Sequence, residues 1–485
     1  MTNIFERILN TSNEYGVVCA TSFPLISAKG LPNVRPGEIV VFENGDTGQV
    51  ISLEPSIVSV LVFSRRIISV NSKIVRTGLN MSASISDTLL NSKSSSLDLA
   101  TLTEDTTGNA IRYPVDALAR GISERVEITE PFVTGVSIVD MLIPLGKGQR
   151  ELIIGDKQSG KTAFCLQILL KQSLEGAICI YACIGKKKED IEYLEKFITK
   201  NNIGSNSVLI TSSADDSLSN IYFTPYIAMC VAEYFRNNGK HVVLILDDLT
   251  THAKYYREMS LLANKFPGRD SYPGDIFYTH SRLVERAGNF NEGSITLLPV
   301  VHTVEGDISG FIQTNLMSMT DGHVFFDKDL FYSGQRPAVD IHMSVTRVGR
   351  QTQSKLRWSI NRELTSFFVL YQKTENFIHF GAELNEGIKN TLSTGRRLLQ
   401  FFTQSPDIIL DLNLQIFFFV LIWSGAWSSK SEQEVYSTMG KFIEAYKMNP
   451  DFKIQVDSIM DHSQDLNTLL GKIMKDVKSY DNFIN

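Results

Sequence analysis

The chain runs Gly155-Asp156-Lys157-Gln158-Ser159-Gly160-Lys161-Thr162 between an apolar segment of strand type, 151–154, and a segment with the composition of a buried helix, 163–170. This order of strand, loop and helix matches the phosphate-loop pattern G-x-x-x-x-G-K-[ST]. Its glycines allow consecutive N–H groups to point inward, and the helix N-terminus adds positive potential. The pattern predicts that Lys161 reaches the β- and γ-phosphates of a nucleotide and that Thr162 binds Mg²⁺. The alternative is an ordinary glycine turn.

The composition narrows the class of protein. The chain has 485 residues, so two or three domains are expected, and its 43% hydrophobic and 21% charged residues are typical of a soluble globular protein. A net charge of −6 argues against binding of nucleic acid by bulk electrostatics. The longest apolar run, 416–423, is too short to span a bilayer, and residues 1–13 lack the features of a signal or transit peptide. We expect no direct membrane insertion.

Before and after the phosphate loop, the sequence patterns predict different types of structure. Residues 15–75 contain short β-segments, two of which flank the turn pair Asn44-Gly45, and they predict a small barrel. Residues 80–109 are rich in Ser and Thr and predict an irregular linker. After about residue 350 we expect a helical bundle, with helices over 374–402, 408–423, 431–448 and 465–480.

The central segment predicts a mostly parallel sheet covered by helices. Helical spacing over 188–200 and 225–237 alternates with strand candidates at 178–184, 207–210, 242–246, 294–301 and 341–345. The wholly apolar strand 242–246 ends at Asp247 and Asp248. A carboxylate at such a strand end can hold Mg²⁺ through water, and we assign that role to Asp247; the alternative is that the two acids cap the next helix.

Six blocks of the sequence resemble the α subunits of F-type ATP synthases. They are 150–163 (RELIIGDKQSGKTA), 233–238 with the Asp247-Asp248 strand, 256–262 (YREMSLL), 267–286 (PGRDSYPGDIFYTHSRLVER), 306–322 and 344–349 (SVTRVG). The resemblance runs from about residue 15 to about residue 415 and is weaker in the barrel, in 80–109 and in the last 60 or so residues.

The resemblance implies an α/β protein of three domains. These are an N-terminal β-barrel at 1–78, a RecA-like nucleotide-binding domain at 79–352 and a C-terminal helical domain at 353–485. Such subunits alternate with three catalytic β subunits around a central rotor stalk and bind ATP or ADP with Mg²⁺ without turning it over. The chain would then be a non-catalytic, regulatory subunit of a proton-translocating ATPase, with a peripheral stalk as a further partner.

The resemblance also assigns site residues. Arg347 resembles the arginine finger that acts in trans on the ATP of the neighbouring β subunit, and Ser344 matches a position needed for activity. Nucleotide contacts are implied for residues 155–163, including Ala163, and for Arg336, while Gln404 aligns with one of two glutamines lining the adenine pocket. The Asp247-Asp248 bond is cis in the family, and 267–275 resembles the loop that lines the bearing for the rotor stalk.

At two positions of the nucleotide site, this chain differs from the α subunits that it resembles. The catalytic partner has a glutamate that activates water, and α subunits commonly have Gln there, whereas this chain has Lys186. A protonated lysine cannot act as a general base. It could pair with a phosphate or lie as a solvated loop lysine. The second adenine-lining glutamine is replaced by Pro406, which has no donor.

Two other functions compete with this one. A stand-alone hexameric ATPase, of the secretion or vacuolar catalytic type, would need a glutamate at position 186. An RNA-translocating motor of the termination-factor type would need base-stacking aromatics and a basic central loop. The Phe-, Asn- and Lys-rich composition without a presequence predicts a mitochondrially encoded subunit at the matrix side of the inner membrane, with a plastid or bacterial membrane as the alternative.

Overall fold

The computed structural model describes residues 4–101, 110–379, 386–480 and 483. Its internal contacts divide the chain into two compact units. The first unit contains Met1–Glu127, Ser173–Thr303 and Asp307–Thr320, and the second contains Ile128–Gln172, Val304–Gly306 and Asp321–Asn485. The three domain boundaries given above stay a prediction.

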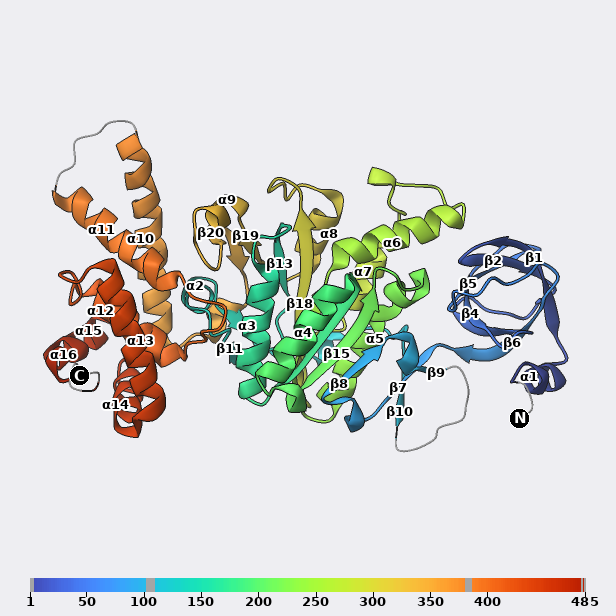
Figure 1. Ribbon diagram of the computed structural model, residues 1–485, viewed down its shortest axis with the longest axis horizontal. Coiled ribbons are helices and arrows are strands. Elements are labelled where there is room, and N and C mark those ends of the chain that lie inside the picture. Colours follow the sequence, from blue (N-terminus) through green and yellow to red (C-terminus); the bar gives the residue numbers. More distant parts are fainter. Residues whose placement is uncertain (1–3, 102–109, 380–385, 481–482, 484–485) are drawn as a thin grey trace. The chain divides into compact units, whose positions relative to one another are not determined.

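The first unit begins with helix α1 (Ile4–Ser12) and a closed antiparallel barrel, as predicted (Figure 1). Its strands are β1 (Tyr15–Ser22), β2 (Leu25–Lys29), β3 (Glu38–Phe42), β4 (Thr47–Leu53), β5 (Val58–Val62) and β6 (Lys73–Asn80). Inward-facing residues such as Val18, Val40 and Val60 form the barrel core because alternate side chains of a strand share one face. Gly45, with φ of 85°, makes the predicted turn between β3 and β4.

Five parallel strands form the sheet of the first unit. In order across the sheet they are β8 (Ser92–Ser95), β15 (Ser207–Ser213), β14 (Ile178–Lys186), β16 (His241–Asp247) and β18 (Ser294–Thr303), and the short β17 (Gly288–Asn289) pairs antiparallel with β18. Helix α4 (Lys188–Lys200) packs against β15, and α6 (Leu249–Leu262) packs against β14 and β18. The helices α7 (Ile276–Val284) and α8 (Phe311–Met319) complete this unit. Parallel strands end at one edge of a sheet, so residues at the ends of β14, β16 and β18 meet there.

The segment 80–109 is not the irregular linker that we expected. Strand β8 extends the parallel sheet beside β15, and β7 (Ser82–Ile85) forms a small sheet with β9 (Ala100–Thr101) and β10 (Ile111–Pro114). The Asn220 amide oxygen of helix α5 (Leu218–Asn237) accepts a hydrogen bond from the Ser96 hydroxyl at 2.5 Å, which ties this segment to that helix. Serine-rich strands carry no apolar alternation, so the sequence pattern does not reveal them. Residues 102–109 lie outside the described chain.

Helix α5 (Leu218–Asn237) begins earlier than the predicted 225. The Ser217 side chain caps it by accepting a hydrogen bond from the Asn220 N–H. Pro225, which favours a first helical turn, lies instead inside the helix. The helix packs on β14 and β16.

The second unit holds a smaller sheet. Its strand β13 (Glu151–Asp156) runs parallel to β19 (Gly322–Phe326), and β20 (Val339–Thr346) pairs antiparallel with β19. Strand β19 was not predicted. The unit also contains the helices α2 (Ser137–Leu142), α3 (Lys161–Leu174) and α9 (Lys328–Tyr332) and the strand pair β11 (Pro131–Phe132) and β12 (Leu145–Gly146).

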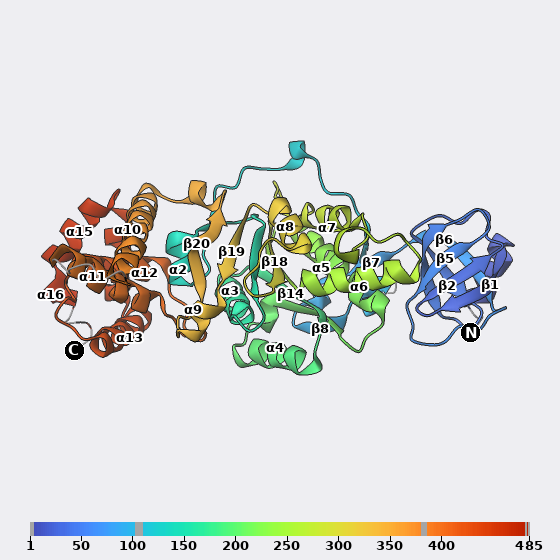
Figure 2. The same cartoon turned by 90° about the horizontal axis from the view of Figure 1, so that it is seen from above.

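The C-terminal part is helical, as predicted, with altered boundaries (Figure 2). Its helices are α10 (Lys355–His379), α11 (Glu386–Phe402), α12 (Leu412–Trp423), α13 (Glu432–Met448), α14 (Pro450–Asp461), α15 (Leu466–Lys475) and α16 (Val477–Tyr480). The prediction missed most of α10 and all of α14. Asn449 caps α14 by accepting hydrogen bonds from the Asp451 and Phe452 N–H groups. Helix α12 is apolar nearly all round because it is buried among its neighbours.

Candidate functional site

The predicted phosphate loop links β13 to α3, as its sequence requires. A Cβ atom on Gly155 would lie 2.3 Å from the Phe326 carbonyl oxygen, so a larger residue has no room there. Gly160 has φ of 96°, which also favours glycine. Ser159 is buried and donates to the Asp156 carbonyl at 2.8 Å. The predicted residues Lys157, Gln158 and Thr162 are exposed, and Ala163 is half-buried.

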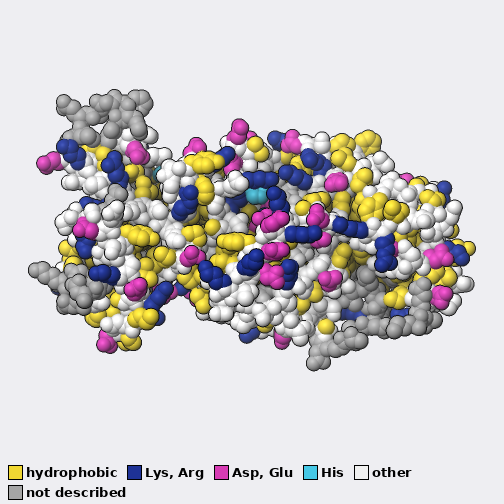
Figure 3. Space-filling model, in the orientation of Figure 1, with side chains coloured by type: hydrophobic (Ala, Val, Ile, Leu, Met, Phe, Trp, Pro, Cys, Tyr) yellow, Lys and Arg dark blue, Asp and Glu magenta, His cyan; other side chains and the backbone are white. Residues whose placement is uncertain are grey.

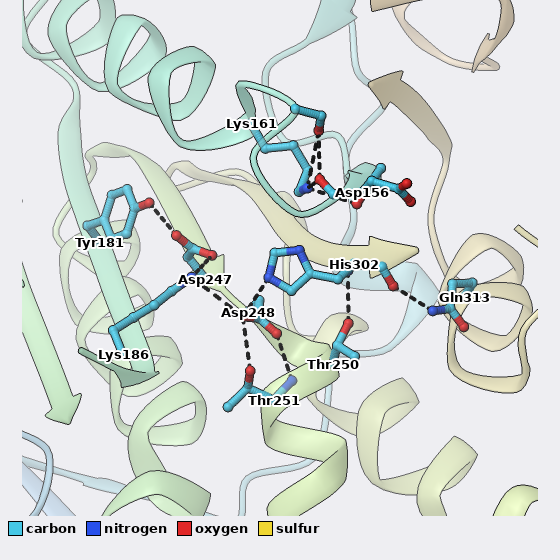
Figure 4. Close-up of polar contacts among 12 residues, drawn as sticks. Asp156, Lys161, Tyr181, Lys186, Asp247, Asp248, Thr250, Thr251, His302 and Gln313 are labelled. Carbon is cyan, nitrogen blue, oxygen red and sulfur yellow. Dashed lines mark hydrogen bonds and ion pairs between the residues drawn. The ribbon is translucent and has the colours of Figure 1, made fainter. Parts of the chain in front are cut away.

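Lys161 is buried at the centre of this loop (Figure 4). Its ammonium donates to the Gly155 carbonyl at 2.8 Å and to the Asp156 carbonyl. The Asp156 carboxylate accepts a hydrogen bond from the Gly306 N–H at 3.0 Å, which anchors the strand side of the loop. The loop carbonyls thus hold the Lys161 ammonium at the centre of the loop, where the phosphate-loop pattern requires a cation.

Arg336 lies near the same loop, and the ring of Phe331 packs between them. The guanidinium carbon of Arg336 lies 3.5 Å from the centre of the Phe331 ring. A Cβ built on Gly160 would in turn lie 3.5 Å from that ring, so Phe331 packs between the arginine and the loop. Arg336 also donates to the Gln335 carbonyl at 2.9 Å. These contacts hold the guanidinium beside the ring.

The Gln404 side chain is buried and hydrogen-bonded within the second unit. Its Nε2 donates to the Gly135 carbonyl at 2.7 Å and to the Ile408 carbonyl, and its Oε1 accepts from the Ser137 N–H at 3.2 Å. The amide therefore joins the segment before α2 to the loop between α11 and α12. Its adenine contact stays a prediction. Pro406 is exposed in that loop.

Ser344 and Arg347 belong to β20 and the turn after it. The Ser344 hydroxyl accepts from the Phe325 N–H at 2.9 Å and donates to the Asp340 carbonyl at 2.5 Å. These bonds lie where the pairing of β19 and β20 shifts register. Arg347 is exposed, and within the described ranges of the chain its guanidinium forms no hydrogen bond or ion pair. Its backbone N–H donates to the Asp321 carbonyl at 3.2 Å.

In the first unit, Asp247 ends β16 and is almost completely buried. Its Oδ1 lies 2.7 Å from the Lys186 ammonium, and its Oδ2 accepts from the Tyr181 hydroxyl at 2.7 Å (Figure 4). The Asp247-Asp248 peptide bond is cis, as the resemblance implied. The ion pair brings together the two sequence-predicted residues of this unit.

Asp248 caps the next helix, the role that the sequence analysis gave as the alternative for Asp247 and Asp248. Its carboxylate accepts from the Thr251 N–H at 2.6 Å and from the Thr251 hydroxyl at 3.0 Å, at the start of α6. It also lies 3.1 Å from His302 Nε2 and 3.5 Å from Lys186 Nζ. Asp248 is thus a cap and Asp247 is not.

Electrostatics fix the charge state of this cluster. Burial opposes the charge of Lys186, but the Asp247 and Asp248 carboxylates outweigh it and raise the pKa of Lys186 above its ordinary value. Burial also disfavours the Asp248 carboxylate, but its hydrogen bond with His302 and the charge of Lys186 lower the pKa of Asp248. Lys186 is therefore a half-buried, ion-paired ammonium at neutral pH and not a solvated loop lysine.

Three polar residues in the strands around these sites were missed by sequence reasoning. Tyr181 and His302 are polar residues in the strands β14 and β18, on either side of β16, and a polar residue in an otherwise apolar strand was the available signal. Glu151 begins β13 and is fully buried, with its Oε2 accepting from Gln149 at 2.7 Å. Burial raises the pKa of Glu151 well above its usual value.

Comparison with known proteins fits this arrangement. Residues 135–346 match the model of the ATP synthase alpha/beta family, nucleotide-binding domain, and residues 353–477 match that of the ATP synthase alpha/beta chain, C terminal domain. The chain is 34% identical to the ATP synthase subunit alpha of Sulfurovum sp. (strain NBC37-1), over 98% of this chain and 97% of the relative. The chain belongs to the F-type ATP synthase alpha subunits.

Two further alpha subunits show a similar likeness over nearly their full length. That of Helicobacter pylori (strain Shi470) is 35% identical, over 96% of this chain and 94% of the relative. That of Ehrlichia canis (strain Jake) is 34% identical, over 98% and 97%. The alpha subunit role in a rotary ATP synthase, with nucleotide binding and assembly with other subunits, therefore extends to this chain.

Proposed function

We propose that this alpha subunit binds ATP or ADP without hydrolysing it and supplies Arg347 to the catalytic site of a neighbouring beta subunit. The nucleotide would bind at residues 155–163 with Arg336 nearby. An arginine that acts on the ATP of another subunit needs a guanidinium that is not ion-paired within its own chain. The exposed Arg347, which forms no ion pair with the described residues, is the observation that carries this proposal.

Lys186 supports the non-catalytic role. Hydrolysis needs a base that accepts a proton from water, and an ammonium held by two carboxylates has no free lone pair for this. Asp247 is engaged by Lys186 and Tyr181, and Asp248 caps α6. The carboxylates nearest to Lys186 are therefore committed to other contacts.

The loop 267–275 supports contact with the rotor. Its backbone is closed by a hydrogen bond from the Gly268 N–H to the Tyr272 carbonyl at 2.7 Å. Phe266, immediately before it, is 96% exposed. The closed loop thus presents Pro267 beside the exposed ring of Phe266, next to the exposed Arg269 and Asp270, and such an exposed mixed surface can contact a partner subunit. We assign this loop to the rotor and leave the peripheral stalk as a further proposed partner.

We place the subunit on the matrix side of the mitochondrial inner membrane, with a plastid or bacterial membrane as the alternative. In the described part of the chain, every helix is too short or too polar to cross a bilayer. On the face drawn in Figure 3, Lys and Arg side chains are interspersed with Asp and Glu. An extended basic surface, which nucleic-acid binding by charge requires, does not form on that face.

Substitution of Arg347 in the native complex tests this function. Arg347→Ala should lower ATP turnover by about a thousandfold while nucleotide stays bound to this chain, because the guanidinium acts on a different subunit. Arg347→Lys should recover little, since an ammonium lacks the planar fork. Arg350→Ala, at an exposed arginine three residues along, is the control. Normal turnover in Arg347→Ala would overturn the proposal.

A further inference from the structure

A row of three residues crosses the sheet of the second unit and ends beside Arg347. Glu151 of β13 pairs with Gly322 of β19, and Gly322 pairs with Thr346 of β20, the residue before Arg347. A Cβ atom on Gly322 would lie 2.6 Å and 2.8 Å from the two carboxyl oxygens of Glu151. The missing side chain of the glycine therefore leaves the space in which the Glu151 carboxyl group lies.

The buried amide of Gln149 links Glu151 to Thr346. Its Nε2 donates to Glu151 Oε2 at 2.7 Å and to the Thr346 hydroxyl at 3.4 Å. Its Oε1 accepts a hydrogen bond from the Gly146 N–H at 2.8 Å. Only the NH₂ end of an amide can donate, so the acceptor on Glu151 determines which end of Gln149 faces Thr346.

The Thr346 hydroxyl closes the turn that carries Arg347. It donates to the Pro144 carbonyl at 2.9 Å and accepts from the Gly349 N–H at 3.3 Å. A Cβ atom on Gly349 would clash with the same Pro144 carbonyl oxygen, so the turn packs directly on the segment before β12. Thr346 and Gly349 are therefore both held in place, and the exposed Arg347 lies between them.

Stability alone does not explain a glutamate at position 151. The residue is fully buried, and among the described residues its Oε1 has no hydrogen-bond partner. A buried polar atom without a partner lowers stability, and an apolar side chain would avoid this cost. Burial also raises the pKa of Glu151 well above its ordinary value, which favours the uncharged carboxyl group. The contact with Gln149 is therefore the feature that distinguishes this side chain from an apolar one.

We propose that Glu151 is a positioning residue, which sets the direction of Arg347 through the side chains of Gln149 and Thr346. The inference rests on the proposed function, in which Arg347 acts on the ATP of a neighbouring beta subunit. The role requires a hydrogen-bond acceptor at Glu151 and not a negative charge. Glutamine supplies such an acceptor in a side chain of the same shape, whereas leucine supplies none.

The experiment measures ATP turnover of the native complex with substitutions at position 151. Glu151→Leu should lower kcat by about tenfold with little change in KM, because a displaced guanidinium weakens the transition state more than substrate binding. Glu151→Gln should restore kcat to within about twofold of the wild type, because it keeps the acceptor. Glu363→Leu, at an exposed glutamate of α10, is the control.

A second variant tests the same link at a less buried position. Thr346→Val removes the hydroxyl with little change of shape, and kcat should again fall by about tenfold. This variant decides the question if the complex with Glu151→Leu does not assemble. An unchanged kcat in Thr346→Val would show that the link does not position Arg347.

Combination with Arg347→Ala separates this inference from the proposed function. In the Arg347→Ala background, Glu151→Leu should not lower the residual rate further, because there is no guanidinium left to position. A further tenfold loss in that background, or a Glu151→Gln variant as slow as Glu151→Leu, would overturn the role of Glu151 and leave the proposed function standing. Normal turnover in Arg347→Ala alone would overturn the proposed function, and this inference with it.

Discussion

The Ser344 hydroxyl accepts a 2.9 Å hydrogen bond from the Phe325 N–H at the point where β19 and β20 shift register. Three residues later the chain reaches the exposed Arg347. The bond fixes the irregular pairing of the strand that leads to Arg347. This gives a structural reason why a serine whose side chain is turned into its own sheet would affect catalysis on another subunit.

Replacement of Ser344 should therefore lower turnover through the position of Arg347. Ser344→Ala leaves the Phe325 N–H without its partner, and we expect a loss of roughly 1–3 kcal/mol in unfolding free energy. ATP turnover of the native complex should fall by about tenfold, less than in Arg347→Ala. Ser344→Thr, which keeps the hydroxyl, should restore much of the rate. A rate unchanged in Ser344→Ala would show that the bond does not position Arg347.

Gln404 should contribute to the stability of the second unit. Gln404→Leu removes the partner of the Ser137 N–H and of the Gly135 and Ile408 carbonyls, all of which lie in the second unit. We expect the free energy of unfolding to fall by about 2 kcal/mol, measured by denaturant titration. Gln351→Leu, at an exposed glutamine, is the matched control. Equal stability of the two variants would contradict this role for the buried amide.

The buried pair His252 and His280 should make the chain sensitive to mild acid. Their ring nitrogens lie 3.1 Å apart. Burial lowers the pKa of His252 to about 4, and burial together with His252 lowers the pKa of His280 well below its ordinary value. An unfolded histidine takes up a proton near about pH 6.5. Below that pH the folded state therefore binds fewer protons than the unfolded state. The free energy of unfolding is retained above about pH 6.5 and decreases as the pH falls below it.

For His252 alone, the loss between about pH 7 and about pH 5 is about 2 kcal/mol. Denaturant unfolding of the full-length chain across this range measures it. His252→Phe should flatten the dependence, whereas His342→Gln, at an exposed histidine, should leave it unchanged. A dependence equally steep in the wild type and in His252→Phe would contradict the assignment.

Sequence patterns predicted those parts of the fold and the site whose structure is determined by residues close together in the sequence. The phosphate loop, the strand that ends at Asp247 and the turn at Gly45 each follow from a few consecutive side chains. Strand β8 was missed because its serines show no alternation and it pairs only after β15 has formed. The start of α5 was missed because Pro225 resembles a first helical turn, although Ser217 supplies the cap.

Contacts between residues that are far apart in the sequence could not be predicted from sequence patterns. Lys186 was found as a departure from the family, but its contact with Asp247 depends on the register of β14 and β16, in which Cys183 lies opposite Asp247. Tyr181 and His302 join the cluster only through the order of three parallel strands. The side-chain bonds of Gln404 and Ser344 depend in the same way on contacts made after folding.

The most direct test of the proposed function is an assay of nucleotide occupancy and turnover on the isolated chain and on the native complex that purifies with it. We predict bound nucleotide and no hydrolysis for the isolated chain, and strong hydrolysis in the complex, because the catalytic base belongs to another subunit. Steady hydrolysis by the isolated chain would contradict the account and make this a catalytic subunit.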